Sequence, residues 1–161
     1  MWDSWAIITD FVGQPLEAWI SDNGGIDDNT LLQVILDLML CFNKIHNRGY
    51  AHGDVAVRNI IRRSEHFYLI DYGLSTLIHF QYNPLQILIN DYIGLCHIIG
   101  IIKYGKKISL SELSNILDGK LKQFVTSVED AINWKITDET IWLKKFYEFI
   151  FPHGVVGVGT K

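Results

Sequence analysis

At the centre of the chain stands the stretch that decides its interpretation, His52-Gly53-Asp54-Val55-Ala56-Val57-Arg58-Asn59. Asp71-Tyr72-Gly73 begins twelve residues after Asn59. Residues 50–61 predict an irregular loop, whereas the aromatic and β-branched run 67–70 predicts a strand that ends at Asp71. Taken alone, His52 would be interpreted as a buried structural histidine and Asp54 as a turn residue. The spacing of all these residues together is what indicates a function.

Helices are predicted on both sides of this stretch. A long helix precedes it, with Asn29 or Thr30 as its N-cap and Gly49 ending it. Its apolar stripe is Leu31, Leu32, Ile35, Leu38, Met39, Phe42 and Ile45. After it, helices are predicted over 90–103, 109–117, 119–133 and 138–150, with the candidate caps Asn90 or Asp91, Ser109, and Thr137 or Asp138. Towards the N-terminus, residues 6–11 predict a short strand, and Pro15 opens a short helix through Ile20.

Length and composition predict one domain. The chain has 161 residues, of which 48% are hydrophobic and 20% charged. This length buries enough surface for a core without a disulfide or metal, and the composition is that of a globular protein. We therefore expect residues 1–161 to form a single domain of the α+β class, predominantly α, with a few short strands.

The charge and the cysteines of the chain indicate its class of partner and its compartment. The net charge is −4 and no basic run occurs, which argues against nucleic acid or an anionic membrane as partner. Cys41 and Cys96 lie in apolar helical patterns, as buried thiols of a reducing compartment do. The N-terminus lacks a basic signal-peptide region, and the apolar stretch 92–102 is about half of a membrane span. We expect an intracellular, cytoplasmic protein.

The spacing of 52–59 and 71–73 resembles the catalytic and metal loops of the protein kinase superfamily, H-x-D-x-x-x-x-N followed by a short hairpin and D-F-G. The resemblance implies a kinase-like C-terminal lobe whose hairpin carries both loops, with ATP and Mg²⁺ as cofactors. Asp71 would bind the metal that bridges the phosphates, and Asn59 would bind a second metal. Asp54 would orient the acceptor hydroxyl or accept its proton, and Arg58 would contact the transferred phosphate.

The resemblance also implies structural and nucleotide-binding residues. His52 would brace the catalytic loop by hydrogen bonds, Gly73 would complete the metal loop, and Asp91 would hydrogen-bond the backbone of the catalytic loop. Residues 6–13 resemble the strand and hinge that hold adenine, which places Thr9, Asp10, Phe11 and Val12 near the purine. The remaining histidines have no metal-ligand spacing and are expected at the surface or in the core: His46, His66, His79, His97 and His153. The aromatic residues between 134 and 149 are expected in the core.

The sequence departs from the family in the parts that grip phosphate. Its first basic residue is Lys44 and its first glutamate is Glu17, so no lysine–glutamate pair precedes the hinge, and no G-x-G-x-x-G occurs. The chain therefore resembles a C-lobe without an N-lobe. Gly53 replaces the arginine of the H-R-D triplet, which argues against switching by loop phosphorylation. The seventeen residues 74–90 contain no A-P-E and leave little room for a peptide-docking shelf.

Two classes of function are compatible with these features. The first is an ATP-dependent phosphotransferase acting on a protein Ser, Thr or Tyr hydroxyl, with a separate N-lobe supplied by another chain or a longer product. A small-molecule kinase of the aminoglycoside phosphotransferase type, which shares the H-G-D loop, is the variant of this class. The second is a catalytically silent decoy or regulator that binds a kinase or its substrate, with Trp2, Trp5 and Phe11 facing the missing lobe. A decayed gene fragment is a third reading, against which the intact acidic residues argue.

Overall fold

The computed structural model describes residues 13–78 and 84–133 of the chain. Five helices occupy most of this part: α1 Leu16–Asp22, α2 Asp28–His46, α3 Pro84–Tyr104, α4 Leu110–Ile116 and α5 Gly119–Asn133. The strands are short: β1 Gln14–Pro15, β2 Tyr50–Ala51, β3 Ile60–Arg63, β4 His66–Leu69 and β5 Thr76–Leu77. The described part also contains the 3₁₀ turns η1 Val57–Asn59 and η2 Tyr72–Leu74. The predicted α+β class, predominantly α, is confirmed.

Several expectations lie outside the described residues. These are the strand 6–11, the nucleotide-binding set Thr9, Asp10, Phe11 and Val12, the exposed aromatics Trp2 and Trp5, His79 and His153, the helix 138–150 with its caps, and the aromatic residues between 134 and 149.

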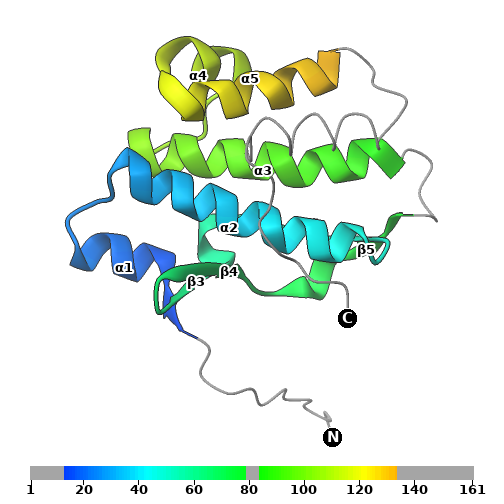
Figure 1. Cartoon of the computed structure of the whole chain (residues 1–161), viewed down its shortest axis with the longest axis horizontal. Coiled ribbons are helices and arrows are strands. Elements are labelled where there is room, and N and C mark those ends of the chain that lie inside the picture. The colour runs from blue at the N-terminus through cyan, green and yellow to red at the C-terminus, as the bar shows by residue number, and fades with distance from the viewer. Residues whose placement is uncertain (1–12, 79–83, 134–161) are drawn as a thin grey trace, which may run out of the picture.

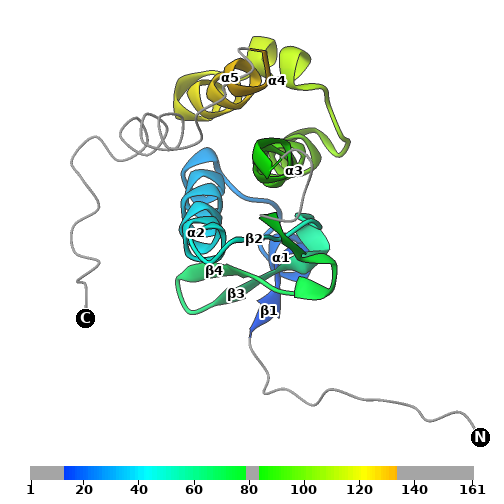
Figure 2. The same cartoon turned by 90° about the vertical axis from the view of Figure 1, so that its right-hand side faces the viewer.

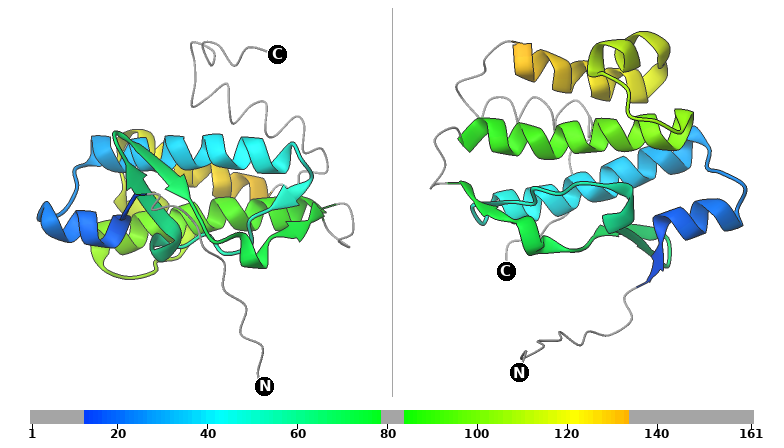
Figure 3. Two further views of the ribbon diagram at one scale, coloured as in Figure 1. Left: turned by 90° about the horizontal axis from the view of Figure 1, so that it is seen from below. Right: turned by 180° about the vertical axis from the view of Figure 1, so that it is seen from behind.

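The strands form two small antiparallel sheets on the same side of α2 (Figures 1 and 3). The first has the order β1-β3-β4 and the second pairs β2 with β5. Helices α2 and α3 lie between these sheets and the α4–α5 pair (Figure 2). Most of the buried apolar side chains form one core cluster, which includes the α2 residues Leu31, Val34, Ile35, Leu38, Met39 and Phe42.

The long helix α2 follows from its predicted apolar stripe, but its ends differ from those expected. The N-cap is Asp27, whose carboxylate accepts a hydrogen bond from the Thr30 N–H at 2.7 Å. That bond satisfies one of the unpaired amides of the first turn and holds the pKa of Asp27 below its usual range. The helix ends at His46, and Gly49, with φ of 82°, returns its N–H to the His46 carbonyl at 2.8 Å.

Helix α3 begins at Pro84, six residues before the predicted start at residue 90. Asn90 and Asp91 are therefore interior residues and not caps, which corrects the prediction. The apolar part of the helix is also longer than the expected stretch 92–102. The window Gln86–Tyr104 has the length and composition of a membrane span, but 56% of it is buried within the described part of the protein. Packing in the core accounts for this apolar character.

The remaining elements agree closely with the sequence prediction. Helix α5 has the predicted bounds, and Ser109 caps α4 by accepting the Glu112 N–H at 3.3 Å. The prediction of an irregular loop over 50–61 is wrong at both ends, because β2 occupies Tyr50–Ala51 and β3 begins at Ile60. Both short strands depend on partners distant in sequence, β5 for β2 and β4 for β3.

Candidate functional site

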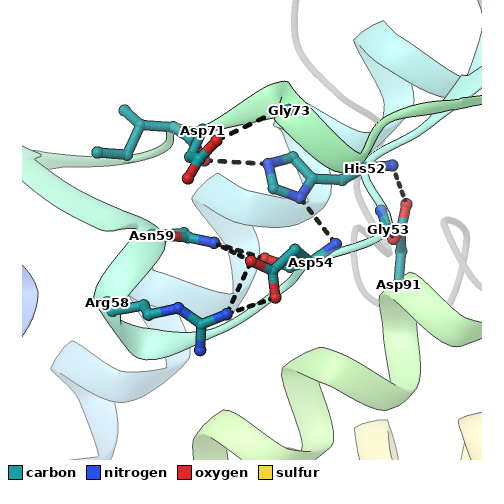
Figure 4. Close-up of polar contacts among 9 residues, drawn as sticks. His52, Gly53, Asp54, Arg58, Asn59, Asp71, Gly73 and Asp91 are labelled. Carbon is teal, nitrogen blue, oxygen red and sulfur yellow. Dashed lines mark hydrogen bonds and ion pairs between the residues drawn. The ribbon is translucent and has the colours of Figure 1, made fainter.

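The β3–β4 hairpin brings together the two halves of the sequence motif. Ile60 pairs with Leu69 across the ladder, and the Ile70 N–H donates to the Asn59 carbonyl at 2.8 Å. Asn59 therefore lies opposite Ile70, and Asp71 follows directly where the ladder ends. Figure 4 shows Asp54, Asn59 and Asp71 gathered at this end of the hairpin. The spacing of twelve residues between Asn59 and Asp71 thus corresponds to a hairpin of two four-residue strands, β3 and β4, joined by a turn at residues 64 and 65.

Asp54 is held by its neighbours in the loop. Nη2 of Arg58 donates to both carboxylate oxygens, at 2.7 and 2.8 Å, and Nδ2 of Asn59 donates to Oδ2 at 2.9 Å. The hydrogen bond from Asn59, followed by the hydrogen bond and charge of Arg58, lowers the pKa of Asp54 from its ordinary value, and partial burial opposes this shift. The Asp54 carboxylate is therefore ionised at neutral pH.

The Asn59 amide is oriented by the same contacts. Its Nδ2 donates to the backbone carbonyl and to the carboxylate of Asp54, both at 2.9 Å. With both amide hydrogens committed to Asp54, Oδ1 is the atom left for a further partner. The residue is 5% exposed, so this orientation is fixed by its surroundings.

Asp71 presents its carboxylate in a different way. The residue is exposed and adopts a left-handed backbone conformation, with φ of 60°. Its Oδ1 accepts the Gly73 N–H at 3.2 Å, which shapes the turn after β4. Positive φ is uncommon for a residue with a side chain and occurs at functional sites more often than elsewhere.

These oxygen atoms suit Mg²⁺ in part. Among residues 13–78 and 84–133 no group of three or more His, Cys, Asp or Glu side chains is placed to hold a metal. A closed protein cage of acidic ligands is therefore not formed by the described residues. Magnesium, however, commonly keeps several waters and takes only one or two protein oxygens in addition to substrate phosphates. The Asp71 carboxylate and the Asn59 amide oxygen fit that kind of binding.

His52 connects the two loops of the motif. It is fully buried, and its ring contacts Tyr72 edge-on with 4.8 Å between ring centroids. The Asp54 N–H can only donate, so Nδ1 accepts it at 3.3 Å, and Nε2 then donates to the Ile70 carbonyl at 3.1 Å. The bracing hydrogen bonds expected of His52 are present.

Asp91, from the middle of α3, holds the start of the loop 52–59. It is 1% exposed, and it accepts the His52 N–H at 2.8 Å and the Gly53 N–H at 2.9 Å. The hydrogen bonds expected between Asp91 and the loop backbone are therefore present (Figure 4). A third donor was not predicted. Nε2 of His46 lies 2.9 Å from Asp91 Oδ2, and its side chain is only 3% exposed.

Gly53 has a local reason for being glycine. Its φ is 80°, and a Cβ at this position would lie 2.6 Å from the Leu74 carbonyl oxygen. An arginine, as in the H-R-D triplet, does not fit this backbone conformation without strain. The loop after Asp71 and the loop before Asp54 thus approach each other through an unsubstituted backbone.

An open groove of about 400 Å³ adjoins the motif. It is lined by Ile61, Arg63, Ser64, His66, Tyr68, Leu69 and Ile70. Its lining combines apolar side chains of β3 and β4 with the polar residues Arg63, Ser64 and His66. Ile70, which is also part of the lining, directly precedes Asp71 in the sequence.

Comparison with known proteins adds no relative to these observations. No family model matches the chain, and no curated protein matches it.

Proposed function

We propose that residues 52–73 form the phosphate-transfer centre of a protein kinase-like C-terminal lobe, which binds ATP with Mg²⁺ and transfers the γ-phosphate to a hydroxyl group. The observation that carries the proposal is the hairpin register, which sets Asn59 opposite Ile70 and so brings it near Asp71. Hydrogen bonds from Asn59 hold Asp54 at the same end of the hairpin. The Asp91 bonds to the loop backbone and the hydrogen bonds of the His52 ring support it, because the resemblance implies both.

In this proposal Asp71 and Asn59 hold the metal and the nucleotide phosphates. Asp71 would contribute an exposed carboxylate oxygen, and Asn59 would contribute Oδ1, since its nitrogen is occupied by Asp54. Bound Mg²⁺ would neutralise charge on the transferred phosphoryl group. The groove beside Ile70, whose lining mixes apolar and polar side chains, would accept the base of the nucleotide.

Asp54 would position the acceptor hydroxyl. Its lowered pKa makes the carboxylate a reliable hydrogen-bond acceptor at neutral pH but a weak base. A weak base suits phosphoryl transfer, in which orientation and charge neutralisation supply most of the catalysis. Arg58, whose side chain is 63% exposed, would balance the Asp54 charge and offer its remaining donors to the transferred phosphate.

A protein Ser, Thr or Tyr hydroxyl is the acceptor that the family resemblance favours. One observation favours a small hydroxylated molecule instead. Because α3 begins at Pro84, only ten residues, 74–83, connect Gly73 to it, and β5 within this connection pairs with β2. The connection is therefore shorter than the sequence prediction allowed, which reduces the surface available for a bound peptide.

Nucleotide binding is tested by thermal shift and titration calorimetry with ATP, with and without Mg²⁺. The variants are Asp71→Asn and, as the matched control, Asp130→Asn, which neutralises an exposed carboxylate on α5. A ligand specific for the folded state stabilises it by about 2.7 kcal/mol at a hundred times its dissociation constant. We expect a Mg²⁺-dependent shift in the wild type and in Asp130→Asn, and none in Asp71→Asn. An equal shift in all three proteins would contradict the proposal.

Transfer is tested with γ-labelled ATP and two acceptor panels, one of Ser, Thr and Tyr peptides and one of aminoglycosides and other polyhydroxylated small molecules. We expect Asp54→Ala to lower the rate by about 10²- to 10⁴-fold while ATP binding persists. Labelling of only one panel identifies the acceptor class. If Asp54→Ala retains the full biological effect of the chain, the enzyme proposal fails and a binding module acting on a kinase or its substrate replaces it.

A further inference from the structure

We infer that Arg63 is a specificity-determining residue, which makes the nucleotide site select GTP in preference to ATP. The residue lies outside the sequence motif and lines the groove beside Ile70. The inference rests on the proposed function, because it needs the phosphates and Mg²⁺ to be held at Asn59 and Asp71. ATP still binds through its phosphates, but its base makes the poorer contact.

One face of the β3–β4 hairpin carries apolar and basic side chains in a fixed order. Ile61 pairs with Tyr68 across the ladder, and Arg63 pairs with His66 next to the turn. Because side chains alternate along a strand, these four residues share one face of the hairpin, and all four line the groove. From Asp71 towards the turn, the lining therefore changes from apolar side chains to the arginine and the histidine.

This face is long enough for the nucleoside part of a nucleotide. From Ile70 to His66 the extended chain advances four residues, which is roughly 13 Å at the spacing of a β-strand. A nucleotide whose phosphates are bound at the proposed metal site extends its base in this direction, over Ile61 and Tyr68. Tyr68 is 42% exposed and, with Ile61, offers an apolar surface on which an aromatic base stacks. The edge of the base then reaches Arg63.

The guanidinium group of Arg63 is available to a ligand, in contrast to that of the arginine beside it. Arg62 donates to Glu65 at 3.2 Å, lies 4.9 Å from the centre of the Trp19 ring, and has a side chain that is 25% exposed. Arg63 is exposed, and within residues 13–78 and 84–133 no ion pair or side-chain hydrogen bond involves it. An arginine that lines a groove and has no protein partner there can bind a ligand through its full set of donors.

The chemistry of this group distinguishes the two purines. A guanidinium carries five N–H donors in a planar fork and has no acceptor. Guanine presents two adjacent acceptors, O6 and N7, whereas adenine presents the N7 acceptor next to its N6 amino donor. Arg63 therefore makes two hydrogen bonds with guanine, whereas with adenine one of its donors meets another donor. A good bidentate pair of this kind discriminates against the wrong base by about five- to a hundredfold in affinity.

The other polar side chains of the groove do not reverse this preference. Ser64 and His66 line the same end, and each can donate or accept a hydrogen bond, so they serve either base. Adenine is recognised best by a side-chain amide, which accepts from N6 and donates to N7. Among the described residues that line the groove, none carries a side-chain amide or a carboxylate. Arg63 is therefore the side chain of the lining that discriminates between the bases.

The first test compares nucleotides on the wild-type chain by titration calorimetry in the presence of Mg²⁺. The probes are GTP, ATP and inosine triphosphate, which keeps O6 and N7 of guanine but lacks its 2-amino group. We expect GTP and inosine triphosphate to bind with similar affinity, and ATP to bind about five- to a hundredfold more weakly. Equal affinities for GTP and ATP, or tighter binding of ATP, overturn the inference. Inosine triphosphate that binds as weakly as ATP overturns the contact of Arg63 with O6 and N7.

The second test changes the arginine. Arg63→Ala removes the donors, Arg63→Lys keeps the charge but not the fork, and Arg48→Ala, at an exposed arginine after α2, is the control. Because Arg63 is exposed, its variants are expected to fold. We expect Arg63→Ala to lower the affinity for GTP to that for ATP and to leave the affinity for ATP unchanged. Arg63→Lys is expected to retain a smaller preference for GTP, and Arg48→Ala the full preference.

A general attraction between Arg63 and the phosphates would give a different result. Arg63→Ala would then weaken GTP and ATP by the same factor, and this outcome overturns the role of Arg63 in specificity. A preference for GTP that is unchanged in Arg63→Ala overturns it as well.

The two proposals fail in different ways. A chain that binds neither GTP nor ATP contradicts the proposed function, and the inference fails with it. A chain that binds both equally with Mg²⁺, and neither of them after Asp71→Asn, supports the proposed function and contradicts the inference alone.

Discussion

The loop 52–59 has two sides that differ in burial and in hydrogen bonding. On the side of α3, Asp91 is 1% exposed and accepts the backbone N–H groups of His52 and Gly53, and the His46 donor beside it is 3% exposed. On the opposite side, the Asp54 side chain is 25% exposed and that of Arg58 is 63% exposed. Within the eight residues 52–59, backbone N–H groups donate to a buried side chain of α3, whereas the side chains of Asp54 and Arg58 are partly open to solvent.

This difference separates structural from chemical roles. Buried polar groups that are fully hydrogen-bonded define one arrangement of the chain. Exposed carboxylates contribute little to stability and remain available to a ligand. Substitutions on the α3 side are therefore expected to change the free energy of unfolding, and substitutions on the open side to change binding and transfer.

The largest effect is expected from Asp91→Ala, on the buried side. It leaves two loop N–H groups and the His46 ring without their acceptor, and removing one partner from a buried charged pair costs about 3–5 kcal/mol. Urea unfolding followed by circular dichroism measures the change. Asp130→Ala, at an exposed position of α5, is the control and is expected to stay within about 0.5 kcal/mol of wild type. A loss below about 1 kcal/mol in Asp91→Ala contradicts the distinction.

A smaller loss of stability is expected from Asp37→Ala, which removes the hydrogen bond between α2 and strand β4 of the hairpin. Asp37 is 6% exposed and accepts the Phe67 N–H of β4 and the Gln33 side chain, both at 2.9 Å. Without it the buried Phe67 N–H has no acceptor, at a cost of about 1–3 kcal/mol. The same unfolding experiment applies, with Glu65→Ala in the hairpin turn as control, since the Glu65 side chain is 87% exposed. Equal free energies of unfolding in Asp37→Ala and Glu65→Ala would show that the hydrogen bond from Phe67 to Asp37 does not stabilise the protein.

On the open side, Arg58→Ala is expected to change pH dependence more than stability. The pair is partly exposed, so its loss costs no more than about 1 kcal/mol. Because its pKa is lowered, the Asp54 carboxyl group is ionised at neutral pH. It is protonated, and its negative charge is lost, only when the pH falls through its pKa in the folded state. Removing Arg58 takes away one of the groups that lower this pKa, so the acid limb of the transfer rate moves to higher pH. Arg48→Ala, which removes an exposed arginine after α2, serves as control. An acid limb at the same pH in the wild type, Arg58→Ala and Arg48→Ala contradicts the assignment to Asp54.

The smallest expected effect is a difference in reactivity between the thiols of Cys41 and Cys96. Cys96 is fully buried on α3, and burial raises its pKa strongly, whereas Cys41 is partly exposed on α2 and its pKa is raised less severely by partial burial. Because the thiolate is the reactive form, iodoacetamide is expected to modify Cys41 slowly and Cys96 only on unfolding. Mass spectrometry of the native protein checks the order. Modification of Cys96 first would show that α3 is less firmly packed than described.

Local signals predicted much of the architecture. The apolar stripe predicted α2, the serine cap at Ser109 predicted the start of α4, and the β-rich run before Asp71 predicted β4. Each of these depends on residues within one turn or one strand. The start of α3 was misplaced because Asp91, a good cap by residue type, has its carboxylate engaged by a loop about forty residues earlier in the chain.

The site was predictable only in its motif. Asp54, Asn59 and Asp71 were recognised by spacing, and the hairpin register explains why that spacing brings them together. The contact of His46 with Asp91 was not predicted, because it joins two residues that are 45 positions apart in the sequence. The same holds for Gly53, whose conformation is set by the Leu74 carbonyl on the other loop.

The central claim, that the open side of the loop holds metal and nucleotide, is tested most directly by paramagnetic NMR with Mn²⁺ in place of Mg²⁺. The ¹⁵N-labelled chain is titrated with Mn²⁺ in the presence of a non-hydrolysable ATP analogue. The account predicts that the amide signals of Asn59, Asp71 and Gly73 broaden first, and that Asp71→Asn abolishes this broadening while Asp130→Asn does not. Broadening centred elsewhere in the chain, or unchanged in Asp71→Asn, would contradict it.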